Sequence, residues 1–233
     1  MNLLLIKPSE LQNGSVVLDD DRANHIIKNI KSKNGDTLRA GVVNGEVGSA
    51  TIMEIDKRSV TLKFKAEETA PTAPQISLIL ALPRPKAFRR ILFGAVSCGV
   101  KDIHIINTWR VEKSYWNSPY LSSDKIESYC LEALSQAKDT IMPRVQFHRF
   151  FTSFIEEIIP NLPSHRLRYI AHPYGKSAES PTAPATIAIG PEGGFIEREV
   201  ETFIDLGFRT FSTGERTLTT EHFVPFILGK LIC

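Results

Sequence analysis

The sequence predicts an α/β protein with a small, strand-rich first part and a larger second part built on a mostly parallel sheet. Three observations predict this class. The first 67 or so residues carry a hairpin signal and a strand of alternating apolar and basic side chains. Residues 67–75, EETAPTAPQ, lack an apolar period and resemble a linker. Beyond them, short apolar runs alternate with amphipathic stretches, which is typical of a parallel sheet covered by helices on both faces.

The first part is predicted to consist mainly of short strands. Asn44 and Gly45 separate two apolar-rich runs within residues 36–55, which is a strong hairpin signal. The strand over residues 59–67 is expected to bury one face, carrying Val60, Leu62 and Phe64. One helix is predicted to interrupt the strands, over residues 21–36. An acid near its start can cap it, Gly35 is expected to end it, and its buried stripe is Ile26, Ile27 and Ile30.

The second part is predicted to alternate strands and helices. The expected strands are residues 76–82, 102–106, 144–150, 167–172, 186–190 and 208–212. The expected helices are residues 86–100, 123–139, 152–159, 195–207 and 221–233. The first of these helices should bury Phe88, Leu92, Ala95 and Val96. Pro225 leaves the start of the last helix open, because proline is tolerated best in a first turn.

Composition limits the classes of function. The net charge is only +2, so nucleic-acid binding would have to come from local basic clusters. No apolar run approaches the roughly 18 residues of a membrane span, and the N-terminus lacks a secretion signal. The three cysteines have neither the spacing of a zinc site nor that of a disulfide framework. We therefore expect a cytoplasmic protein without membrane association.

Three loops are expected at the carboxyl ends of the parallel strands, where ligands bind in such sheets. They are residues 171–175, 190–195 and 212–222. The middle loop, GPEGGF, matches neither GxGxxG nor a Walker loop. Three acids in and after it would repel a pyrophosphate and favour a neutral or cationic ligand, such as adenosine hydroxyls or a sulfonium: Glu192, Glu197 and Glu199. An alternative is a plain strand-to-helix junction in which the acids complement the helix dipole.

The last loop gathers polar residues before an apolar helix. Capping by Thr219 or Thr220 would explain part of it, but it would not explain Gly214 and Arg216. The stretch IGPEGGF, followed by a helix and then LGFRTFSTGERTLTTEHF, resembles the methyltransferases that modify N3 of uridine in small-subunit ribosomal RNA, a family of the SPOUT superfamily. The segments HIIKNIKSKNGD and ALSQAKDTIMPRV resemble further stretches of that family. The chain departs from the family pattern at Lys31, Asp139, Thr213, Thr219 and His222.

The resemblance implies a fold and a cofactor. The expected fold is a PUA-like β-barrel domain that binds RNA, residues 1–70, and a SPOUT-type trefoil-knot domain, residues 71–233. The expected cofactor is S-adenosyl-L-methionine, without a metal. Its expected binding residues are His172, Ile189, Gly190, Pro191, Glu192, Gly193, Gly194, Ser212, Thr213, Gly214 and Leu218.

The resemblance also implies a reaction. Uridine N3 must lose a proton, so charge that develops on the carbonyl oxygens of the base needs a hydrogen-bond donor. Arg216 is the candidate donor, because a guanidinium keeps its charge. Glu221 is expected either to orient Arg216 or to accept the proton.

The expected partner is ribosomal RNA or the small ribosomal subunit, bound by a homodimer that forms through the C-terminal domain. Two basic clusters are candidates for RNA contacts, although solvated side chains on amphipathic helices would look the same. The first is Arg22, Lys28, Lys31, Lys33 and Arg39; the second is Arg84, Lys86, Arg89 and Arg90. Two other functions stay open: a related methyltransferase with another RNA target, and a non-catalytic RNA-binding or ribosome-assembly protein.

Overall fold

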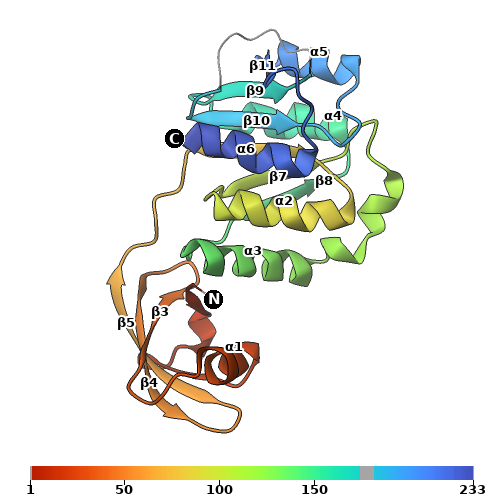
Figure 1. Cartoon of the computed structure of the whole chain (residues 1–233). Coiled ribbons are helices and arrows are strands. Elements are labelled where there is room, and N and C mark those ends of the chain that lie inside the picture. The colour runs from red at the N-terminus through yellow and green to blue at the C-terminus, as the bar shows by residue number, and fades with distance from the viewer. Residues whose placement is uncertain (1, 174–180, 233) are drawn as a thin grey trace. The chain divides into compact units, whose positions relative to one another are not determined.

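The computed structural model describes residues 2–173 and 181–232 (Figure 1). The chain divides into two compact units. Unit 1 is Met1–Thr72 with Leu131–Met142, and unit 2 is Ala73–Cys130 with Pro143–Cys233. Helix α3, Ser123–Ala137, therefore supplies residues to both units.

Unit 1 contains a curled five-stranded sheet with the order β1-β3-β4-β5-β2. The β1 and β3 strands are parallel, and the other neighbours are antiparallel. The strands are β1 Leu4–Ile6, β2 Ser15–Leu18, β3 Thr37–Val42, β4 Val47–Ile55 and β5 Val60–Glu68. The hairpin at Asn44 and Gly45 is confirmed, and Asn44 has a φ of 60°.

The core of unit 1 follows from the alternation of side chains along the strands. Val60 and Leu62 are fully buried, whereas Lys63 and Lys65 on the opposite face are exposed, as predicted. The strands pack so closely that a Cβ on Gly48 would lie 2.0 Å from the carbonyl oxygen of Lys65. Glycine is therefore required at this position of β4.

The helix of unit 1 is shorter than predicted. It consists of α1, Asp21–His25, and a π-helical turn, Ile26–Ile30. It ends at Lys31, which has a left-handed φ of 58° and whose N–H donates to the Ile26 carbonyl, and not at Gly35. Ile26 is buried but Ile30 is exposed, because the wider π-helical turn breaks the 3.6-residue period on which the predicted stripe depended.

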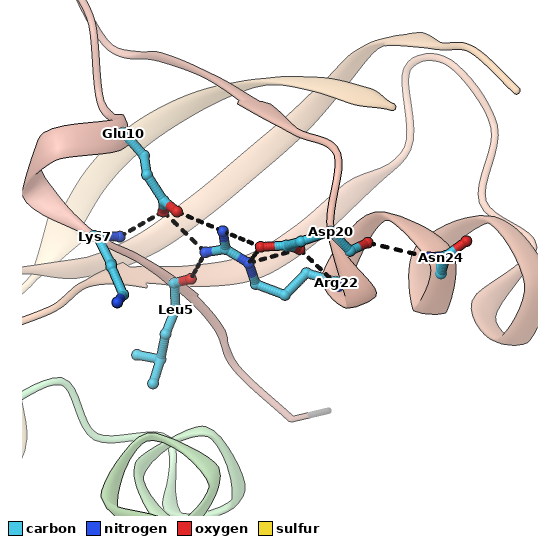
Figure 2. Close-up of polar contacts among 6 residues, drawn as sticks. All are labelled: Leu5, Lys7, Glu10, Asp20, Arg22 and Asn24. Atoms are coloured by element: carbon cyan, nitrogen blue, oxygen red, sulfur yellow. Dashed lines mark hydrogen bonds and ion pairs between the residues drawn. The ribbon is translucent and has the colours of Figure 1, made fainter. Parts of the chain in front are cut away.

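Arg22 binds two carboxylates at the start of α1 (Figure 2). Its Nη2 donates to Glu10 at 2.6 Å and to Asp20 at 2.7 Å, and its Nη1 donates to the Leu5 carbonyl at 2.8 Å. Burial opposes the charge of Arg22, but the hydrogen bonds to the two carboxylates outweigh it and raise the pKa of Arg22. Those bonds lower the pKa values of Glu10 and Asp20. Asp20 also caps α1 through the Arg22 N–H, as an acid near the helix start was expected to do.

Unit 2 contains a six-stranded sheet with the order β11-β9-β10-β6-β7-β8, in which every neighbouring pair is parallel. The predicted α/β class and parallel sheet are thereby confirmed. The strands are β6 Ile76–Ala81, β7 Asp102–Ile106, β8 Arg144–His148, β9 Leu167–Ala171, β10 Ala185–Ile189 and β11 Arg209–Phe211. The β6 and β10 strands are completely buried, as their mostly apolar sequences indicate.

Helices cover both faces of this sheet (Figure 1). On one face, α2 (Pro85–Ser97) packs against α6 (Thr220–Ile232), although α6 follows the edge strand β11. On the other face, α4 (Phe151–Ser153) contacts α5 (Glu197–Asp205) through Phe151 and Phe203, whose rings lie 5.9 Å apart. A π-helical turn, Phe154–Ile158, follows α4. Pro225 lies inside α6, so the helix begins upstream of this proline.

Short 3-10 turns complete the chain at Pro8–Glu10, Lys113–Asn117, Pro119–Leu121 and Ile159–Asn161. The buried face of α2 is the predicted one, with Phe88, Leu92, Ala95 and Val96 shielded. Among the described residues, no helix is long and apolar enough to cross a membrane.

A buried polar cluster crosses the β6, β7 and β8 strands. His104 is 3% exposed, its Nδ1 lies 3.1 Å from His148 Nε2, and its Nε2 lies 3.3 Å from Asp102. Burial, together with the nearby charges of His104 and Arg144, lowers the pKa of His148 to about 4. Burial alone would raise the pKa of Asp102, but hydrogen bonds from His104 and Ser77 and the charge of Arg166 bring it below its ordinary value.

We expect Arg22→Ala to destabilise unit 1 by roughly 1–3 kcal/mol, because it leaves two carboxylates facing each other without their shared donor. Urea unfolding followed by circular dichroism measures this effect. Lys28→Ala on the same helix is the control and should change stability by less than about 0.5 kcal/mol, because Lys28 is exposed. Equal effects of the two substitutions would contradict a structural role for Arg22.

We expect the buried histidine cluster to make stability depend on pH. His148 has an ordinary pKa of 6.5 that folding lowers to about 4. Between these values the unfolded chain binds more protons, so the free energy of unfolding rises with pH across this window. In His148→Gln the rise should be shallower. Urea titrations across the window measure both slopes, and identical slopes would show that His148 does not titrate on unfolding.

Candidate functional site

Three candidate loops leave neighbouring strands. Because the sheet order is β11-β9-β10, the loops after these strands lie side by side at one edge of the sheet. The His172 N–H donates to the Phe211 carbonyl at 3.0 Å, which joins the first loop to the end of β11, directly before the third loop. Residues 174 and 175 of the first loop lie outside the described residues. The predicted convergence of the three loops is thus explained by strand order, which periodicity could not supply.

The turn after β10 is tight. The Gly194 N–H donates to the Pro191 carbonyl at 2.8 Å, and Gly194 has a φ of +73°. A Cβ on Gly190 would lie 3.0 Å from the Phe195 nitrogen and 3.2 Å from Gly194. Ile189, Gly190 and Pro191 are buried, while Glu192 and Gly193 are exposed. The glycines therefore close the turn, and its tip remains accessible.

Glu192 holds the turn against α2. Its Oε1 accepts the Arg84 N–H at 3.0 Å, at the residue that precedes the helix. This N–H has no partner within its own helix, so an acidic side chain from another loop satisfies it. Glu192 therefore has a structural role in addition to any effect of its charge on a ligand.

Glu199 is the buried acid of the site. It is 6% exposed; its Oε1 accepts the Trp109 N–H at 2.7 Å, and its Oε2 accepts the Ile196 N–H at 3.0 Å. The second bond caps α5, and the first reaches the loop after β7. Arg110 of that loop donates to the Gly193 carbonyl. The loop after β7 is thereby tied to the turn after β10 at two points.

This loop after β7 was not among the candidate loops. Glu199 lies three residues after Ile196, the residue that precedes α5. This spacing is typical of a capping box, so the sequence could have identified Glu199 as an acceptor of a backbone N–H. The sequence holds no local signal for the second partner, because Trp109 lies 90 residues away.

The loop after β11 is the most exposed part of the site. The Gly214 N–H donates to Ser212 Oγ at 3.2 Å, and Gly214 has a φ of +110°. Thr213 is half-buried and Leu218 is 40% exposed. Arg216 is exposed, and within residues 2–173 and 181–232 its guanidinium has no ion pair or hydrogen bond. It is therefore available to a substrate.

Three residues at the start of α6 have partners within the chain. Glu221 forms an ion pair with Arg90 of α2, with an Nη2–Oε2 distance of 2.7 Å, so its partner is Arg90 and not Arg216. This contact raises the pKa of Arg90. Thr219 Oγ1 lies 2.7 Å from His222 Nδ1, and the Thr219 carbonyl accepts the His222 N–H at 2.9 Å. Thr219 and His222 are thus bonded to each other at the start of α6.

The predicted RNA-contact residues fall into different settings. Arg84 and Lys86 are exposed at the start of α2, and the Arg89 guanidinium lies 5.2 Å from the Tyr129 ring centre. In unit 1, Lys28, Lys31 and Lys33 are exposed, and Arg39 pairs with Glu68. Arg22 differs from the exposed lysines, because it is half-buried and each of its three guanidinium nitrogens donates to Glu10, Asp20 or Leu5.

Known proteins resemble this chain along almost its entire length. A sequence model described as an RNA methyltransferase domain matches residues 70–230. The ribosomal RNA small subunit methyltransferase E of Treponema pallidum is 31% identical over 230 residues, which cover 95% of this chain and 86% of that protein. The ribosomal RNA small subunit methyltransferase E 1 of Borreliella burgdorferi is 28% identical, covering 95% of this chain and 93% of that protein.

Solved structures share the fold. The crystal structure of a ribosomal RNA small subunit methyltransferase E from Neisseria gonorrhoeae, bound to S-adenosyl methionine, superposes with a TM-score of 0.76 at 17% identity. The superposition covers 99% of this chain and 96% of the Neisseria chain. The structure of a putative methyltransferase from Legionella pneumophila, also in complex with this cofactor, superposes with a TM-score of 0.75 at 19% identity. That superposition covers 98% of this chain and 96% of the Legionella chain.

We expect Glu199→Ala to loosen the site, because it leaves two backbone N–H groups without their acceptor. Stability should fall by roughly 1–3 kcal/mol, and hydrogen exchange at the Trp109 and Ile196 amides should accelerate. Mass spectrometry of peptides covering these residues measures the exchange. Glu201→Ala, an exposed acid of the same helix, is the control and should leave both amides protected. Unchanged exchange in Glu199→Ala would contradict the proposed tie between the loops.

Proposed function

This chain belongs to the ribosomal RNA small subunit methyltransferase E family of RNA methyltransferases, and from that premise we propose that it transfers a methyl group from S-adenosylmethionine to ribosomal RNA. The proposed target is N3 of a uridine in small-subunit RNA. The observation that carries the proposal is the arrangement of the loops after β11, β9 and β10, which share one edge of the sheet.

The residues at this edge fit an adenosyl ligand. A Cβ on Gly194 or Gly214 would meet no atom within 4 Å, so both backbones are open to a bound molecule. Glu192 adds an exposed carboxylate, which favours a cationic ligand over a phosphate. We assign cofactor binding to the loop residues predicted from the sequence: His172, Ile189, Gly190, Pro191, Glu192, Gly193, Gly194, Ser212, Thr213, Gly214 and Leu218. When bound, S-adenosylmethionine supplies a methyl group activated by its sulfonium.

The remaining chemistry falls to side chains of the loop after β11. Arg216 is exposed and charged, so it can donate to a uridine carbonyl oxygen as negative charge builds up on the base. Glu221, in the first turn of α6, is the acid that the sequence predicts to assist it. It is paired with Arg90, so a role as proton acceptor requires that this ion pair opens when RNA binds. Binding holds the reactants in line, and good orientation can lower the barrier by roughly 7–11 kcal/mol.

Ribosomal RNA, free or in the small subunit, is the proposed partner. The exposed cations of both units are the proposed phosphate contacts: Lys28, Lys31, Lys33, Arg84, Lys86, Arg89 and Arg90. Binding should then weaken steeply with salt. We further propose that residues 1–70 form a PUA-like RNA-binding domain and residues 71–233 the catalytic domain, and that the protein acts in the cytoplasm as a homodimer.

The proposed function predicts that the purified protein binds S-adenosylmethionine and transfers a labelled methyl group to small-subunit RNA. Arg216→Ala should lower the single-turnover rate by roughly a hundredfold or more and leave cofactor affinity, measured by calorimetry, unchanged. Arg209→Ala is the control, because this exposed arginine lies at the start of β11, at the opposite end of the strand from the loops. A folded protein that binds the cofactor but transfers no methyl group to RNA would contradict the proposal.

A further inference from the structure

Trp109 is an exposed ring on a fixed backbone. It follows β7 and is 80% exposed. Its N–H, however, is bound at 2.7 Å by the buried carboxylate of Glu199. Tryptophan is usually highly buried, because its ring is a large apolar surface. The backbone is anchored, and the exposed ring is free to contact a ligand.

The other tryptophan of the chain shows the contrast. Trp116 donates its indole N–H to Asn107 Oδ1 at 2.8 Å, and the Arg149 guanidinium lies 5.5 Å from the centre of its ring. Its ring also packs edge-on against Phe147, with centres 6.4 Å apart. The Trp109 ring has no hydrogen bond or ring contact with any residue in the described part of the chain. Trp116 thus stabilises the fold, whereas Trp109 makes no such contact.

The backbone of Trp109 is tied to the turn after β10. Glu199 joins it to Ile196 at the start of α5, and Arg110, the next residue, donates to the Gly193 carbonyl. Gly193 belongs to the turn to which cofactor binding is assigned above. The ring is therefore displayed from a loop that cannot shift without moving this turn, which reduces the ordering cost of a contact made there.

We propose that Trp109 is a stacking platform for an unstacked nucleobase of the RNA substrate. The inference rests on the proposed function. A base that is methylated on its ring must leave its stack, and this leaves the bases next to it with an uncovered face. An aromatic side chain can cover such a face, and stacking of this kind accepts any base.

Charge along the loop favours RNA over an apolar protein partner. The exposed neighbours of Trp109 in the sequence are Arg110, Glu112 and Lys113, while Val111 is buried. Protein interfaces are marked by contiguous apolar patches, which this loop segment does not present. A single ring beside two cations and one acid, with a net positive charge, resembles the surfaces on which single-stranded nucleic acid binds, where rings stack on bases and cations contact phosphates.

The test compares Trp109→Ala and Trp109→Phe with the wild-type full-length chain, using in-vitro-transcribed small-subunit ribosomal RNA as the probe. Filter binding gives RNA affinity, calorimetry gives S-adenosylmethionine affinity, and sedimentation gives the oligomeric state. We expect Trp109→Ala to bind RNA roughly tenfold more weakly or worse, with cofactor affinity and oligomeric state unchanged. Trp109→Phe should recover most of the loss, because a smaller ring still stacks.

Fluorescence gives a second readout. RNA should quench the emission of the wild-type protein, which has two tryptophans, but not that of Trp109→Phe, in which only Trp116 remains.

Three outcomes would overturn the inference. Equal RNA affinity of Trp109→Ala and the wild type would show that the ring contacts no base, while leaving the proposed methyl transfer intact. A changed oligomeric state would assign the ring to a second copy of the chain. A wild-type protein that neither binds RNA nor transfers methyl groups would remove the proposed function and this inference together.

Discussion

The arrangement of the site depends on one buried carboxylate. Glu199 accepts N–H groups from Trp109 and Ile196, and so joins the loop after β7 to the helix after β10, two strands that β6 separates. A buried acid is costly unless its oxygens are hydrogen-bonded, and here both are. Arg110 and Glu192 add further ties to the same turn. The result is a glycine turn held from both sides, which is the rigid support that a binding loop needs.

Much of the fold could be predicted because its signals are local. The Asn44–Gly45 hairpin, the buried face of α2 and the alternation of strands and helices after residue 75 all follow from neighbouring residues. Helix ends were less predictable. The helix of unit 1 finishes with a π-helical turn, Ile26–Ile30, and ends at Lys31 and not at the predicted Gly35. Helix α6 contains Pro225 in its interior. Strand order depends on long-range pairing, which no local pattern contains; it alone explains why the three candidate loops meet.

Charges were the least predictable feature of the site, because a side chain's partner can lie anywhere in the chain. Arg22 looks like part of a basic RNA-binding helix, but Glu10 and Asp20 occupy its donors (Figure 2). In the sequence, Glu192 and Glu199 indicate only a loop that repels phosphate, but both accept backbone N–H groups. Glu221 lies near Arg216 in the sequence but pairs with Arg90, 131 residues away. The glycines, whose role is set by the local backbone, were interpreted correctly as a tight turn.

The proposed reaction is methylation of a uridine of small-subunit ribosomal RNA at the loops on the carboxyl edge of the unit 2 sheet. The most direct measurement is a nucleotide-resolution methylation map of that RNA, isolated from cells with and without the gene for this protein. We expect one N3-methyluridine to disappear without the gene and to return with the wild-type gene. An unchanged map, with the protein expressed and folded in the cells that carry the gene, would contradict this expectation.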